Sequence, residues 1–205
     1  MGNRCLIIYA SRTGNTAKVA ERIKTTFERN GWQCDSFNID KKTDAMNPPF
    51  DFKNYDFVCA GTGLYMHSPY DEILYLIRTK FFGIDPRQMG RVENRRPAES
   101  SQEAPDFHKK ITLGPGSKSS IVFATYAGFE FGPAEAEPAM ALLALELAHL
   151  QFRCLGHISC PGRFLKSATP TTYHGDTRNR PNEKDLLKVE IFVEEKLEEI
   201  AQRPA

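Results

Sequence analysis

The sequence predicts an α/β fold in which helices cover both faces of a parallel β-sheet. Short apolar runs alternate with longer segments of helical periodicity along most of the chain. Polar loops that contain glycine follow several of the apolar runs. The length of 205 residues suits one domain with a sizeable core, or one domain with a large insertion. We therefore expect residues 1–205 to form a single domain.

Five strands are expected, because five short apolar runs are bounded by polar residues or glycine. They are, in chain order, Cys5–Ala10, Trp32–Ile39, Tyr55–Gly61, Ser119–Thr125 and Arg153–Cys160. The first run is continuous and apolar, which is typical of a buried strand. The second alternates between apolar and polar residues only in part.

Four helices are expected from apolar residues spaced three and four apart. They are Gly14–Asn30, Asp71–Phe82, Glu135–Phe152 and a final helix that begins after Pro181. Gly31 stands where a C-terminal glycine belongs, and Asn182 is expected to cap the final helix. The leucines of the third helix spread widely around it, which predicts a helix covered by the sheet and the final helix. A homodimer through this helix is the alternative.

Two polar segments interrupt this alternation. Gly83–Lys118 is rich in Arg, Glu, Pro, Ser and Gly and has almost no apolar periodicity, and Arg163–Arg180 is a second polar connection. A long loop inside a compact domain is uncommon and is usually functional or disordered. We expect the segment at about 83–118 to be an insertion within the domain that helps to choose a partner protein.

Composition excludes several classes of protein. The 27 basic and 26 acidic residues give a net charge of +1, which argues against general nucleic-acid binding. No apolar run approaches the ~18 residues of a membrane span. The five cysteines include no Cys-x-x-Cys pair, so no iron–sulfur cluster or other metal site is expected. These features predict a soluble, reduced, cytoplasmic protein.

The loop between the first strand and the first helix carries the strongest functional signal. It reads Ser-Arg-Thr-Gly-Asn-Thr at residues 11–16. In an open parallel sheet, ligands bind beyond the carboxyl ends of the strands, and the first turn of a helix suits a phosphate. Gly14 would let the backbone close around the anion. Because neither a dinucleotide fingerprint nor a Walker lysine motif is present, a mononucleotide phosphate is the predicted ligand. Simple capping of the helix is the alternative.

Two further loops combine glycine with large planar side chains at the carboxyl end of a predicted strand. Residues 62–69 follow the third strand, and residues 126–133 follow the fourth. Such side chains would hold a flat aromatic ligand by stacking on its faces, while backbone groups would bind its edge.

The strand followed by Ser-Arg-Thr-Gly-Asn-Thr resembles the flavodoxins, whose phosphate loop has Thr or Ser, any residue, Thr-Gly, any residue, and Thr. The resemblance covers most of the chain, with five strands in the expected order of appearance. It implies a flavodoxin-like three-layer α/β/α sandwich with a five-stranded parallel sheet in the order 2-1-3-4-5, and one non-covalently bound FMN. Long-chain flavodoxins carry their insertion inside the fifth strand, whereas the extra residues here precede the fourth.

Carried over position by position, the resemblance assigns the FMN phosphate to the first loop and the flavin ring to the other two. The phosphate residues would be Ser11, Arg12, Thr13, Gly14, Asn15 and Thr16, with Arg12 and Gly14 contributing backbone. The ring residues would be Thr62, Gly63, Leu64, Tyr65 and Met66 on one side, and Thr125, Tyr126, Ala127, Gly128 and Phe129 on the other. Tyr65 and Tyr126 are the candidates for stacking. No catalytic residue is assigned, because the cofactor supplies the redox chemistry.

The resemblance implies an electron-transfer flavoprotein that shuttles electrons between partner redox proteins, since one flavodoxin core and its insertions fill the chain. Flavodoxins usually surround the flavin with acidic residues, so the near-neutral charge, Arg12 and His67 predict a less negative lowest potential.

Two alternatives stay open. Gly61–Tyr65 and the helix after it are also similar to the flavodoxin-like, menaquinone-dependent protoporphyrinogen oxidases. That likeness would make the chain an FMN-dependent oxidoreductase with a quinone acceptor. A flavin-free binding module with the same fold is the other alternative.

Overall fold

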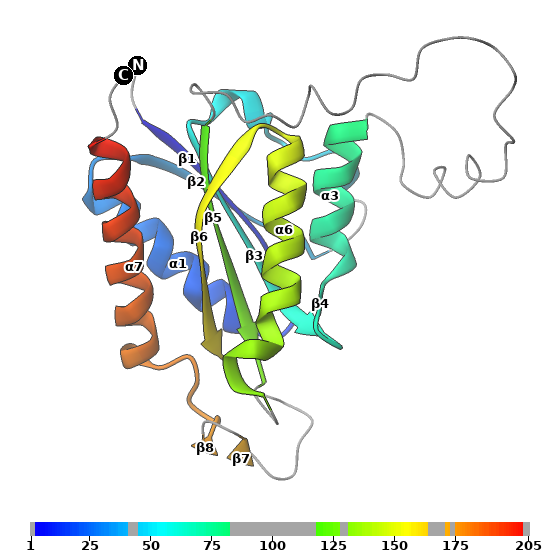
Figure 1. Ribbon diagram of the computed structural model, residues 1–205, viewed down its shortest axis with the longest axis vertical. Coiled ribbons are helices and arrows are strands. Elements are labelled where there is room, and N and C mark those ends of the chain that lie inside the picture. Colours follow the sequence, from blue (N-terminus) through cyan, green and yellow to red (C-terminus); the bar gives the residue numbers. More distant parts are fainter. Residues whose placement is uncertain are drawn as a thin grey trace, which may run out of the picture.

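The computed structural model describes residues 3–40, 45–82, 118–127, 131–163, 171–172 and 175–202. Five long strands form a parallel sheet in the order β2-β1-β3-β5-β6 (Figure 1). They are β1 (Arg4–Ala10), β2 (Gln33–Asn38), β3 (Phe57–Tyr65), β5 (Lys118–Tyr126) and β6 (Phe152–Pro161). The predicted order 2-1-3-4-5 is confirmed, because β5 and β6 are the fourth and fifth long strands. The short β4 (Ser68–Pro69) adds a sixth, antiparallel strand that was not predicted.

The register of the sheet brings the three predicted ligand loops to one edge. Ala10, the last residue of β1, pairs with Thr62 of β3, and Gly63 pairs with Thr125 of β5. Since these strands are parallel, their carboxyl ends lie together, at the lower end of the sheet in Figure 1. A small antiparallel ribbon of β7 (Thr171–Thr172) and β8 (Gly175–Asp176) lies beyond the same end.

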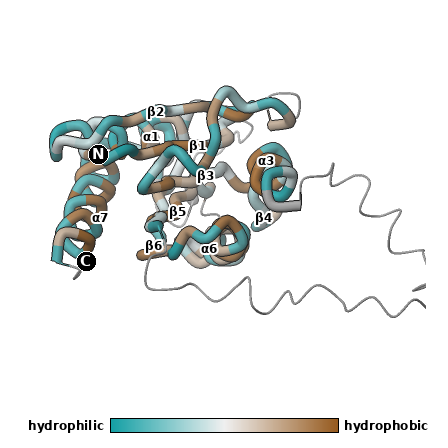
Figure 2. Tube along the Cα trace, turned by 90° about the horizontal axis from the view of Figure 1, so that it is seen from above, coloured by the Kyte–Doolittle hydropathy of each residue, from teal (hydrophilic) through white to brown (hydrophobic). Residues whose placement is uncertain are grey.

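Among the described residues, long helices cover both faces of the sheet (Figure 2). On one face lie α1 (Asn15–Arg29) and α7 (Glu183–Ala201), and on the other lie α3 (Asp71–Phe82) and α6 (Glu137–His149). Two 3₁₀ helices, η1 (Phe52–Asn54) and η2 (Gly132–Ala136), precede β3 and α6. Alternate residues of each strand enter the two cores, so that Leu6 and Ile8 pack toward α3 and α6 while Ile7 packs toward α1 and α7.

The prediction that the final helix covers the leucine-rich helix is wrong. The helix α6 packs against the sheet and α3, whereas α7 lies on the opposite face beside α1. The helix also ends earlier than the predicted Phe152, because Gln151 adopts a left-handed conformation with φ of 67° and β6 begins at the next residue.

The third strand runs four residues further than predicted, to Tyr65. Leu64 pairs with Pro69 and Tyr65 with Ser68, so part of the predicted loop is a β-hairpin. Met66 and His67 form its two-residue turn with φ of 48° and 65°. Such positive angles usually select glycine or asparagine, and neither is present to signal the turn.

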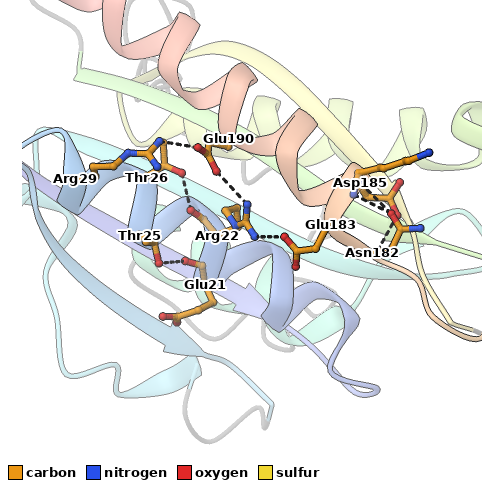
Figure 3. A network of polar contacts seen from close by, with 10 residues as sticks. Glu21, Arg22, Thr25, Thr26, Arg29, Asn182, Glu183, Asp185 and Glu190 are labelled. Carbon is orange, nitrogen blue, oxygen red and sulfur yellow. Dashed lines mark hydrogen bonds and ion pairs between the residues drawn. The ribbon is translucent and has the colours of Figure 1, made fainter.

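An ionic network joins α1 to α7 on the surface (Figure 3). Arg22 pairs with Glu183 at 2.7 Å and with Glu190 at 3.0 Å, and Arg29 pairs with Glu190 at 2.8 Å. At the start of α7, the predicted cap is confirmed, since the Asn182 side chain accepts hydrogen bonds from the first turn. The network joins the last helix to the first, and the cap stabilises the start of the last helix.

No helix in the described ranges is long and apolar enough to cross a membrane. Most of the predicted insertion, residues 83–117, lies outside the described residues, so its expected role stays a prediction.

Candidate functional site

The site is built around the first turn of α1, at the carboxyl end of β1. Gly14 occupies the N-cap position with φ of 81°, and no side chain caps the helix from this position. No atom lies within 4 Å of the place where a Cβ on Gly14 would stand. Within the described part of the chain, the backbone N–H groups of Asn15 and Thr16 have no acceptor. These two groups and the positive end of the helix dipole are therefore open to an anion.

Two hydroxyl groups of the loop are oriented for donation beside this turn. Ser11 Oγ accepts the N–H of Ala17 at 3.2 Å, and Thr13 Oγ1 accepts the side-chain amide of Asn15 at 3.0 Å. Because each oxygen already accepts a bond, each hydroxyl proton is available to a ligand. The N–H of Ser11 donates to Asn38 Oδ1 at 3.1 Å, which braces the loop against the end of β2.

The side chains of Asn15 and Thr16 point inward and position the loop. Asn15 Nδ2 also donates to the carbonyl of Arg163 at 2.8 Å, just beyond β6. A Cβ on Gly162 would lie 2.7 Å from the same nitrogen, so a glycine is needed there. The hydroxyls of Thr16 and Thr125 share a buried hydrogen bond of 2.8 Å. These two predicted phosphate residues thus offer the ligand backbone N–H groups, while their side chains tie the loop to β5 and β6.

The Arg12 side chain contacts Tyr70 and Glu72, at the start of α3. Its guanidinium pairs with Glu72 at the start of α3, at 3.0 Å and 3.2 Å to the two carboxylate oxygens. It also lies over the ring of Tyr70, 4.2 Å from the centroid. The prediction that Arg12 contributes backbone to the phosphate site fits this placement.

The β3–β4 hairpin carries the second group of predicted site residues. Tyr65 and Met66 at its tip are 66% and 79% exposed. Thr62 is buried, and its hydroxyl donates to the Gly63 carbonyl at 2.6 Å and accepts the N–H of Tyr70 at 3.0 Å. These bonds hold the base of the hairpin, while its tip presents a free tyrosine ring for stacking.

The third predicted segment follows β5. Tyr126 is only 3% exposed and packs in the core, and its burial raises the pKa of the phenol. Of the two stacking candidates, Tyr65 is therefore the one with an open ring face. Gly128 and Phe129 lie outside the described residues, and Ala127 is half-buried. Phe131 is 64% exposed on the same connection but was not assigned to the site.

Sequence reasoning missed the residues that brace the loops. Asn38 and Gly162 each end or follow a strand at this same edge, which is a signal that could have found them. Tyr70 and Glu72 carry no comparable signal, because their role depends on contact with Arg12 across the site.

The arrangement suits a ligand with an anionic group and a flat ring. The anion donors lie at α1, and exposed planar side chains lie on the hairpin beside them. In the described ranges, no group of three His, Cys, Asp or Glu side chains could hold a metal ion.

Comparisons with known proteins agree with this description. Residues 6–85 match the family model of a flavodoxin domain, and no curated protein sequence matches the chain. Oxidised flavodoxin 2 from Bacillus cereus is similar in structure, with a TM-score of 0.57, 18% identity, and coverage of 96% of this chain and 99% of that one. A flavodoxin from Streptococcus pneumoniae TIGR4 has a TM-score of 0.54, 14% identity, and coverage of 96% and 99%.

A larger protein contains the same fold. The rubredoxin:oxygen oxidoreductase from Desulfovibrio gigas matches 98% of this chain over 37% of its own length, with 10% identity and a TM-score of 0.55. The structural likenesses show that the chain has a flavodoxin-like fold, and the family match over residues 6–85 agrees with the resemblance drawn from the sequence.

Proposed function

We propose that this protein binds one FMN at the carboxyl edge of its sheet and transfers electrons between partner redox proteins. The observation that carries the proposal is the first turn of α1, where the N–H groups of Asn15 and Thr16 are open and the hydroxyls of Ser11 and Thr13 lie beside them. A phosphate dianion accepts several hydrogen bonds, and such a turn supplies them without a charged side chain. FMN is the cofactor that the flavodoxin resemblance implies, and the family match supports it.

The described residues fit this cofactor. Ser11, Thr13 and the first turn of α1 would hold the phosphate, and Tyr65 would offer its ring to one face of the flavin. FMN supplies the redox chemistry when bound. The contribution of the chain is to hold the phosphate, orient the ring and keep water from part of it. We extend the ring site to Gly128 and Phe129 on the strength of the sequence resemblance.

An electron carrier also needs a surface that contacts its partner proteins. Tyr65 and Met66 are exposed at the tip of the hairpin that would hold the ring, and such an exposed pair suits contact with another redox protein. We propose that the whole chain works as one domain in the cytoplasm, and that the segment at 83–118 selects the partner. A homodimer is a further proposal, which size measurement in solution would test.

An absorption spectrum of the purified protein tests the cofactor. A yellow, FMN-type spectrum is expected, and a colourless protein that does not take up FMN would contradict the proposal. Redox titration then separates the functions, since two resolved one-electron steps favour a carrier. Oxidation of a porphyrinogen by the holoprotein, with a quinone as acceptor, would instead favour the oxidoreductase.

The charge around the site gives the proposal a second test. His67 lies in the hairpin turn, and Arg12 in the phosphate loop offsets the charge of Glu72, whereas acidic residues usually surround the flavin in flavodoxins. Positive charge lowers the cost of adding an electron to the flavin. We expect a lowest reduction potential less negative than that of typical flavodoxins, and the usual very low value would contradict this.

A further inference from the structure

We propose that Arg12, Tyr70 and Glu72 form a clamp that holds the two walls of the flavin site in place before the cofactor binds. We call these three residues the Arg12 clamp. The inference rests on the proposed function and adds positioning residues to it. Its basis is a set of contacts between the phosphate loop and the residues that follow the β3–β4 hairpin.

The ion pair at the centre of the clamp has the geometry of a specific contact. One nitrogen of the Arg12 guanidinium reaches both carboxylate oxygens of Glu72, at 3.0 Å and 3.2 Å. The arginine side chain is 54% exposed, but Glu72 is only 13% exposed, so the carboxylate is held by its surroundings. Glu72 lies in the first turn of α3, where the helix dipole also stabilises a negative charge.

Tyr70 connects the ion pair to the base of the hairpin. The Arg12 guanidinium lies 4.2 Å from its ring centroid, a cation–π distance. The same ring packs so closely on Gly63 that a Cβ there would lie 2.8 Å from it. The N–H of Tyr70 donates to the buried Thr62 hydroxyl at 3.0 Å. The ring is therefore fixed from the side of β3, and it provides a platform for Arg12.

The clamp joins segments that are far apart in the sequence. Arg12 precedes Thr13 and the open turn of α1, which would hold the phosphate. Glu72 and Tyr70 follow the hairpin, which would hold the ring. Because one FMN must meet both walls at once, a fixed distance between them reduces the ordering required on binding.

Substitutions on the two sides of the ion pair test the clamp against a simple effect of charge. If only charge mattered, Arg12→Gln would weaken FMN binding and Glu72→Gln would strengthen it. The clamp predicts that each single variant weakens FMN binding by about threefold to tenfold. The double variant should bind FMN no more weakly than the single variant with the lower FMN affinity. Tyr70→Leu should also weaken binding, whereas Tyr70→Phe keeps the ring and should not. Flavin fluorescence measures each dissociation constant.

A matched control is available on the other face of the sheet. Arg29 is 53% exposed and pairs with Glu194 at 2.7 Å and with Glu190 at 2.8 Å, far in the fold from the carboxyl edge. Arg29→Gln and Glu194→Gln should leave FMN affinity within about twofold of the parent, because they remove surface ion pairs of an equally exposed arginine without touching the site.

Hydrogen exchange on the flavin-free protein provides a readout that does not depend on FMN. The N–H of Ala17, bonded to Ser11 Oγ, reports on the phosphate loop. It should exchange faster in Arg12→Gln and Glu72→Gln than in the parent, and at the parent rate in Arg29→Gln. Tighter FMN binding by Glu72→Gln, or unchanged exchange in both clamp variants, would overturn the clamp. If the parent does not bind FMN, the proposed function fails, and the exchange rates still decide whether the clamp exists.

Discussion

Two glycines with matching backbone conformations allow the phosphate site to be tested separately from backbone strain. Gly14 has φ of 81° at the N-cap of α1, and Gly31 has φ of 80° just beyond its other end. Neither has an atom within 4 Å of the place where a Cβ would stand. Alanine at either position would therefore avoid steric overlap and would suffer the same left-handed strain, about 1 kcal/mol of unfolding free energy.

Only one of the two substitutions should affect the cofactor. Gly14 adjoins the open N–H groups of Asn15 and Thr16, so strain there and an added methyl group displace the anion from them. Loss of one hydrogen bond to a charged group, at about 1.5 kcal/mol, weakens binding about tenfold. Gly14→Ala should thus bind FMN at least about tenfold more weakly than the parent, and Gly31→Ala should bind it with the parent affinity.

The assay combines denaturant unfolding of the flavin-free proteins with titration of FMN fluorescence. Equal losses of unfolding free energy would confirm that the two glycines share the same backbone strain. If Gly14→Ala then bound FMN as tightly as Gly31→Ala, the assignment of the phosphate to the first turn of α1 would be refuted.

Three further predictions concern stability and reactivity. The pKa of Glu190 is lowered from its ordinary value of 4.5 by hydrogen bonds from Arg29 and Arg22, so its stabilising effect is present above about pH 4.5 and lost as pH falls through the lower folded-state pKa. The parent should therefore lose more unfolding free energy between pH 6 and pH 3 than Glu190→Gln, as measured by urea titration at low salt. Gly61→Ala would place a Cβ 2.1 Å from the buried Phe123 ring and should destabilise by about 3 kcal/mol or prevent folding, with partial rescue by Phe123→Leu. Burial raises the pKa of the Cys59 thiol, so it should resist a thiol reagent until the protein unfolds.

Each of these predictions has a control. Glu28→Gln removes a single pair with Lys24 at 3.8 Å and should leave the pH dependence close to that of the parent; the same slope for Glu190→Gln would contradict the first prediction. In Gly156→Ala, the added Cβ would lie 3.1 Å from the ring of Phe192, so this variant should lose less unfolding free energy than Gly61→Ala. For the thiol, complete modification in denaturant sets the full signal, and fast modification of native Cys59 would contradict its burial.

Local sequence signals predicted most of the fold. The boundaries of α3 were predicted as Asp71–Phe82, and Asn182 caps α7 as expected, because periodicity and capping depend on neighbouring residues. The end of β3 was placed too early, since Leu64 and Tyr65 become strand only by pairing with β4. The cover of α6 was also misassigned, because strand order does not by itself say which helix lies on which face.

In the candidate site, too, features set by neighbouring residues could be predicted, and features set by distant contacts could not. The position of the loop at residues 11–14 could be predicted, because these residues lie between a strand and a helix, whereas its binding of a phosphate stays a prediction. The inward orientation of Asn15 and Thr16 could not, since it depends on partners more than 100 residues away at Thr125 and beyond β6. Contacts between distant loops, including the Arg12 clamp, become visible only in three dimensions.

A direct comparison of FMN with riboflavin tests the central claim, because the two ligands share the ring and differ in the phosphate. Equilibrium titration of the flavin-free protein should show saturable binding of one FMN per chain. Riboflavin should bind at least about tenfold more weakly, since it makes no hydrogen bonds to the first turn of α1. Absence of FMN binding, or equal affinity for the two ligands, would contradict the account.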